Sequence, residues 1–306
     1  MARLRASPAR GVGSAGLVLG GAALFGTVGT AEVLGPVVPA AGLGAGRLLV
    51  AAALLLALAV AGGHAAALPG CLRSASTWWA GLGQACFNVC FLAAMLQAGV
   101  AVGTLVAIGA TPIITGLLTR QVSRRWLVAT GVAVAGLVLL VGGQAVGRSV
   151  LQPSVLGIGL ALGASASYAT YIIAGNAAVA RGLPTTPYLA ATFGVSAVLT
   201  LPLLAFGDTD WMARASAWLL VGYLAVVPTV VAYSLFNRGL RGVRSATAST
   251  LGLLEPVVAA LLATLVLGER LSAVAVAGAA LILVGLVLIV RSSAGMTESP
   301  GVRAIP

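Results

Sequence analysis

Ten runs of mostly apolar residues recur along the chain, each close to the roughly 20 residues that a helix needs to cross a bilayer. Only 8% of the residues are charged, whereas soluble domains average about 25%. A soluble fold is therefore excluded. The pattern predicts an all-α polytopic membrane protein with ten transmembrane helices, at residues 14–34, 38–62, 77–97, 100–119, 126–145, 155–176, 186–206, 216–237, 245–267 and 272–291.

The basic residues predict how these helices are oriented. All 17 of them are arginine, and most fall in segments that share one side of the membrane with the N-terminus. The opposite side holds only Arg148, Arg214 and Arg270. Because cytoplasmic loops are enriched in basic residues, we expect a multi-pass protein of the cell membrane with both termini in the cytoplasm. The bilayer thus accounts for the net charge of +11, and nucleic-acid binding is disfavoured.

The chain also contains an internal repeat. "GLVLGGAALFGT" at 16–27 resembles "GLALGASASYAT" at 159–170, and each contains Gly-x-x-x-Gly. The repeat predicts two five-helix halves, 14–145 and 155–291, with a tail at 1–13 and another at 292–306. Because five is odd, the halves must enter the membrane from opposite sides. Inverted repeats are typical of secondary transporters, whose substrate site lies between the halves. Alternatively, the duplication only enlarges the protein and the small residues only let helices pack closely.

One carboxylate interrupts the apolar run "LGLLEPVVAALLATLVLGE" at 251–269. A charged group at the bilayer centre costs at least ~2.5 kcal/mol, so we expect Glu255 to face protein or water. Pro256 cannot donate to the Gly252 carbonyl, and Pro112, in the matching run of the first half, cannot donate to Ile108. We predict a cavity bordered by Glu255, Pro256, Pro112 and the neighbouring Thr111, with Glu255 as a proton acceptor or substrate contact.

Further polar and aromatic residues within the apolar runs are candidates for the same cavity. Arg47 lies inside the second run and has Glu255 and Glu32 as available partners, so that Glu255 is alternatively a structural ion-pair partner. Glu32 itself is interpreted as an interfacial carboxylate without a role. The other candidates are Gln84, Asn88, Tyr168, Tyr171, Tyr223, Tyr233 and Asn237. Gln and Asn also act as glue between membrane helices, so each has a structural alternative.

The stretch from 237 to 290 resembles the C-terminal signature of EamA-type transporters of the drug/metabolite transporter superfamily. The resemblance rests on Leu254-Glu255-Pro256 and on Leu267-Gly268-Glu269. The first half resembles the same domain through "LFGTVGT" at 24–30 and Arg47, but it has Thr111 in place of the glutamate and lacks Gly-Glu near 120–126. The resemblance implies transport of small metabolites, and it favours export.

We therefore predict a secondary transporter that exports small metabolites, such as amino acids, related amphipathic compounds or drugs, by alternating access, with protons as the candidate coupling ion. An intramembrane enzyme and a non-transporting scaffold are the alternatives. The sequence predicts no catalytic residue, because the intramembrane acids are not paired and the single histidine lies at a membrane edge. The three cysteines do not form a metal-binding pattern. No cofactor is predicted, and the sequence does not indicate an oligomeric state.

Overall fold

The computed structural model describes residues 8–145, 154–205 and 207–295, and Arg148 falls outside them. The described part is helical and without strands. Its α-helices are α1 (Pro8–Phe25), α2 (Val28–Leu34), α3 (Ala40–Ala61), α4 (Leu68–Leu72), α5 (Ala75–Ala98), α6 (Val100–Thr119), α7 (Arg124–Ala145), α8 (Val155–Ala180), α9 (Thr185–Ala205), α10 (Ala215–Ala225), α11 (Ala232–Gly239), α12 (Ser245–Leu251), α13 (Leu254–Leu265) and α14 (Ala273–Gly295). Short 3₁₀ turns lie at Ala65–Ala67 and Asp210–Ala213.

Within the described residues, ten segments are long and apolar enough to cross a membrane. Their bounds agree with the predicted runs to within a few residues, so the ten-span fold is confirmed. Three of the ten are interrupted: α1 and α2 form one span, α12 and α13 form another, and α10 continues through a π-helical segment, Val226–Val231, into α11. Large apolar side chains such as Leu219 and Leu265 are exposed on the outside of the bundle, where lipid would cover them.

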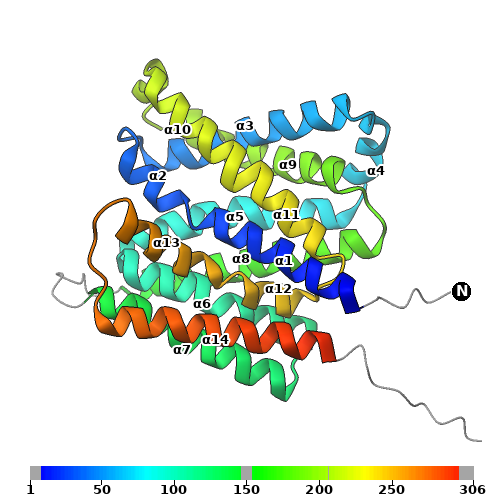
Figure 1. Cartoon of the computed structure of the whole chain (residues 1–306). Coiled ribbons are helices and arrows are strands. Elements are labelled where there is room, and N and C mark those ends of the chain that lie inside the picture. The colour runs from blue at the N-terminus through cyan, green and yellow to red at the C-terminus, as the bar shows by residue number, and fades with distance from the viewer. Residues whose placement is uncertain (1–7, 146–153, 206, 296–306) are drawn as a thin grey trace, which may run out of the picture.

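The spans pack as pairs that join the two proposed halves. In Figure 1, α7 lies beside α14 along one edge of the bundle, and α3 lies beside α9 along the opposite edge. Between them α1 contacts α11, and α5 contacts α8. Each of these pairs contains one span from residues 14–145 and one from 155–291. A two-fold relation between the halves would produce this pattern, and the inverted repeat stays a prediction.

Small residues permit the closest of these contacts, but not at the expected motif. A Cβ at Gly136 of α7 would lie only 2.6 Å from the backbone nitrogen of Ile282 on α14, so glycine sets how near these helices approach. At Gly16 and Gly159, the first glycines of the two Gly-x-x-x-Gly motifs, an added Cβ would meet no atom within 4 Å. At the second glycines, Gly20 and Gly163, it would lie 3.7 Å from Leu235 and 3.6 Å from Cys90, an ordinary contact distance, so these motifs do not set the closest approaches between helices.

Candidate functional site

Two helix breaks meet near the middle of the bundle. The span that begins with α12 stops at Leu251, turns through Gly252 and Leu253, and starts again as α13. The other break, at Gly26 and Thr27 between α1 and α2, packs directly against it: a Cβ at Gly26 would lie 2.7 Å from the carbonyl oxygen of Glu255. Interrupted spans of this kind form the binding sites of many transporters.

The break explains how Glu255 and Pro256 are accommodated in an apolar run. Glu255 lies in the first turn of α13, where the helix dipole stabilises a carboxylate. Pro256 follows it in the same turn, where a missing N–H removes no intrahelical bond. The prediction that Gly252 keeps an unpaired carbonyl is wrong, because the backbone N–H of Glu255 donates to it at 3.0 Å. A helix that restarts supplies this donor, whereas the sequence interpretation assumed one continuous helix.

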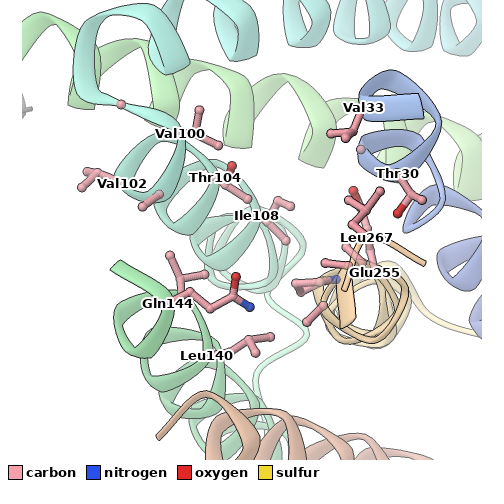
Figure 2. A pocket seen from close by; sticks show the side chains of 18 of the residues that line it. Thr30, Val33, Val100, Val102, Thr104, Ile108, Leu140, Gln144, Glu255 and Leu267 are labelled. Carbon is pink, nitrogen blue, oxygen red and sulfur yellow. The ribbon is translucent and has the colours of Figure 1, made fainter. Parts of the chain in front are cut away.

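Two cavities open beside these breaks. The central cavity, of about 530 Å³, is bordered by α1, α2, α3, α5, α6, α8, α9 and the spans that contain α11 and α13. The side cavity, of about 550 Å³, lies between α2, α6, α7 and α13, and Figure 2 shows Thr104, Ile108, Gln144 and Glu255 around it. Both volumes are typical of small-molecule sites. The residues common to both linings are Gly29, Val100, Thr104, Ile108, Glu255 and Ala259.

Three charged side chains line the central cavity: Glu32, Arg47 and Glu255. Arg47 donates from Nη2 to Oδ1 of Asn88 at 2.7 Å, and Asn88 in turn donates to the backbone oxygen of Gln84 at 2.9 Å. The Nε of Arg47 is buried and has no hydrogen-bond partner. Among the described residues no carboxylate lies within 4 Å of this guanidinium, so the direct Arg47–Glu255 ion pair of the structural alternative is not formed.

An aromatic wall forms the cavity on the α5 and α8 side. The rings of Phe87 and Phe91 stack with centroids 5.2 Å apart, and Tyr168 contacts Phe87 at the same separation. Tyr233 reaches the cavity from α11 and contacts Phe25 at 4.7 Å. Its hydroxyl donates to Oε1 of Gln84 at 3.1 Å, which fixes the ring orientation.

The structure therefore divides the predicted site residues into groups. Glu255, Arg47, Asn88, Thr111, Tyr168 and Tyr233 line the central cavity, and Pro256 lines the side cavity. Gln84, Tyr171 and Asn237 lie behind the wall: Asn237 donates to the hydroxyl of Tyr171 and to the backbone oxygen of Tyr233. Pro112 is buried outside both linings. Tyr223 is exposed on α10 and borders neither cavity.

Glu32 is the residue that sequence reasoning missed. It follows the Gly26–Thr27 break on α2 and lines the central cavity together with Arg47. The signal in the sequence is a single acid within an otherwise apolar run, which the sequence analysis interprets as a carboxylate at the membrane interface.

The central cavity is open at one end of the bundle and closed at the other. Glu32 and Ala40, which line it at the α2 end, are both exposed. At the opposite end α7 is tied to α12: the indole N–H of Trp126 donates to the Ala246 carbonyl at 3.0 Å, and the hydroxyls of Thr130 and Thr250 are 2.9 Å apart. We call this second end the closed end.

None of the three cysteines is among the residues that line the central or the side cavity. Cys71, on α4 outside the spans, is buried, and burial raises the pKa of its thiol. Such a thiol stays protonated. Within the part of the chain that the structure describes, no cluster of three or more metal-ligating side chains is present.

Comparison with known proteins identifies the family. The model of the EamA-like transporter family matches residues 155–291. The chain is 35% identical over 285 residues to the uncharacterized transporter YwfM of Bacillus subtilis, covering 89% of this chain and 92% of YwfM. It is 30% identical over 178 residues to the threonine/homoserine exporter RhtA of Salmonella typhimurium, covering 58% of this chain and 55% of RhtA.

A solved crystal structure shares the fold. It superposes with a TM-score of 0.79 at 22% identity and covers 94% of this chain and 99% of the solved chain. The ten spans, the family match and the full-length relative agree with one another. The chain is thus a transporter of the EamA-like family, within the drug/metabolite transporter superfamily.

Proposed function

We propose that the chain exports a small zwitterionic metabolite, of the amino-acid class, by alternating access around the central cavity. The observation that carries the proposal is that Arg47, Glu32 and Glu255, from α3, α2 and α13, line the same cavity. Arg47 lines the cavity with a positive charge and uses only Nη2 in its hydrogen bond to Asn88, so its guanidinium can pair with a carboxylate. The two glutamates offer anionic oxygens to an ammonium group. A zwitterion satisfies both, whereas a simple anion or cation leaves one sign without a partner.

The side cavity suits the apolar part of such a substrate. Its lining is mostly aliphatic, with Val33, Val102 and Leu140 among the contributors, and Glu255 lines both it and the central cavity. A substrate with its charged groups beside Arg47 therefore has room for an apolar side chain beyond Glu255. The name of RhtA, a threonine/homoserine exporter at 30% identity, supports the amino-acid class.

Transport then requires the closed end to open while the α2 end closes. We infer that the two five-helix halves, 14–145 and 155–291, are an inverted repeat that rocks around the cavity. Glu255, shared by both cavities, serves as the proton acceptor that couples the movement to a proton gradient. The protein lies in the cell membrane with both termini in the cytoplasm, and the α2 end faces outward.

Flux measurements in vesicles test the proposal. Purified protein in liposomes is loaded with a panel of amino acids, threonine and homoserine included, and with matched amines and carboxylic acids that each lack one charged group. We expect efflux of at least one amino acid and little efflux of its single-charge analogues. Equal efflux of the analogues would contradict the role of the charge pair, and no efflux of any amino acid would contradict the substrate class.

A further inference from the structure

A basic groove lies at the closed end, between the first turn of α7 and the end of α14. It has a volume of about 430 Å³, and three arginines line it: Arg124, Arg125 and Arg291. Val128 and Leu288 form its apolar sides, with 55% and 38% of their surfaces exposed. We refer to these five residues as the arginine groove. It shares no residue with the central or side cavity.

The three guanidinium groups lack an internal counter-ion in the described part of the chain. The described acidic residues are Glu32, Asp208, Asp210, Glu255 and Glu269. Two of them line the central cavity, and the other three lie in connections at the α2 end of the bundle. The remaining acid, Glu298, lies outside the described residues. Three clustered cations therefore face one another without a carboxylate, which favours an anion from outside.

The dipole of α7 adds to the mutual repulsion of the three arginines. Arg124 and Arg125 begin α7, and its first turn contains no acidic residue. The N-terminal end of a helix carries partial positive charge, so cations are disfavoured there and an anion is stabilised. A bound anion would offset both the mutual repulsion of the arginines and this dipole effect.

The apolar sides of the groove distinguish a lipid from a free anion. Below the arginines, Val128 and Leu288 continue into other exposed aliphatic residues of the same two helices, including Val284 and Val287. An acyl chain fits against such a surface, whereas inorganic phosphate needs only the arginines. Basic pockets between membrane helices at the cytoplasmic side are typical sites for anionic lipid headgroups.

We propose that the arginine groove binds the phosphate of an anionic phospholipid, whose acyl chains lie along Val128 and Leu288. Arg124 and Arg125 belong to the first half of the chain and Arg291 to the second. The lipid therefore bridges the two halves at the closed end, one residue from Trp126, whose indole donates to the Ala246 carbonyl of α12. Bound lipid stabilises the closed end.

Thermal unfolding of the purified full-length protein in an uncharged detergent tests the proposal. The probes are phosphatidylglycerol, phosphatidylcholine and inorganic phosphate, each added over a concentration series. We expect phosphatidylglycerol to raise the melting temperature by several degrees at about 100 times its Kd. Phosphatidylcholine, which carries no net charge, should raise it much less.

Two triple variants, each of which removes three positive charges, show whether the lipid binds in the arginine groove. Arg124→Gln/Arg125→Gln/Arg291→Gln should lose the phosphatidylglycerol response. The control changes Arg120, Arg238 and Arg244 to glutamine, since these arginines are exposed but lie outside the groove, and it should keep the response. Equal loss in both variants would show non-specific attraction and overturn the site.

Two further outcomes also overturn the proposal. An equal rise with inorganic phosphate, abolished by the groove variant, would make the site a phosphate site and not a lipid site. If phosphatidylglycerol does not raise the melting temperature of the wild-type protein, the groove does not bind this anionic lipid. If the triple variant does not fold, Arg291→Gln alone is measured, and it should weaken the apparent lipid affinity at least several-fold.

Discussion

Replacing Arg47 by glutamine separates recognition of a carboxylate from the stability of the fold. The guanidinium uses Nη2 on Asn88 at 2.7 Å and leaves Nε buried without a partner. A substrate carboxylate that reaches this side chain gains a charge-assisted hydrogen bond of about 1.5–3 kcal/mol. Its loss corresponds to a decrease in affinity of roughly 10- to 150-fold. Glutamine retains an amide that can face Asn88, so we expect the variant to fold.

The assay compares each amino acid that is transported with the amine that lacks its carboxylate. In proteoliposomes, Arg47→Gln should raise the half-saturating concentration of the amino acid by the factor above. The concentration of the amine that half-inhibits this flux should change by less than about threefold, because the amine has no carboxylate that could bond to Arg47. Arg238→Gln, an exposed position outside the cavity, removes the same charge and serves as the control. The reasoning fails if amino acid and amine are affected equally, or if neither is affected.

Three other changes test separate parts of the account. Glu255→Gln cannot exchange a proton, so the variant should fold but lose the pH dependence of flux, and a wild-type pH response in it would exclude Glu255 as the coupling acid. Gly26→Ala places a Cβ 2.7 Å from the Glu255 carbonyl oxygen, whereas at Gly29 nothing lies within 4 Å. Thermal unfolding should therefore show the first destabilised by about 1–3 kcal/mol and Gly29→Ala nearly unchanged, and equal stability would contradict the packing of the two breaks. A membrane-impermeant thiol reagent should label Arg214→Cys from outside intact cells and Arg124→Cys only from the cytoplasmic side, and the reverse result would overturn the orientation.

The spans could be predicted from the sequence because lipid imposes a minimum length of apolar residues on each crossing. Hydropathy alone therefore located all ten. The breaks were harder to predict. The sequence predicts one continuous helix at 245–267, but the chain turns at Gly252, four residues before Pro256, and restarts so that Glu255 occupies a helix N-terminus. The restarted helix packs against Gly26, which lies far away in the sequence, and a local pattern does not show such a contact.

The faces of the helices could not be predicted for a physical reason. In a membrane both the buried and the lipid-facing sides of a helix are apolar, so periodicity does not separate them. Tyr223 and Tyr233 are both candidates because they lie in one apolar run, yet the first is exposed and the second lines the central cavity. Polar residues four apart indicate the buried side of a helix better than apolar periodicity does. Gln84 and Asn88 both belong to the hydrogen-bond network that holds Arg47 and Tyr233.

Locking the closed end tests the central claim most directly, namely that transport proceeds by alternating access to the central cavity. The hydroxyls of Thr130 and Thr250 lie 2.9 Å apart across α7 and α12. We introduce Thr130→Cys and Thr250→Cys into a protein whose three native cysteines are changed to alanine, with each single cysteine as a control. Oxidation should form a disulfide only in the double variant, stop amino-acid flux while substrate still binds from the α2 end, and be reversed by reduction. Undiminished flux in the fully cross-linked protein would contradict the account.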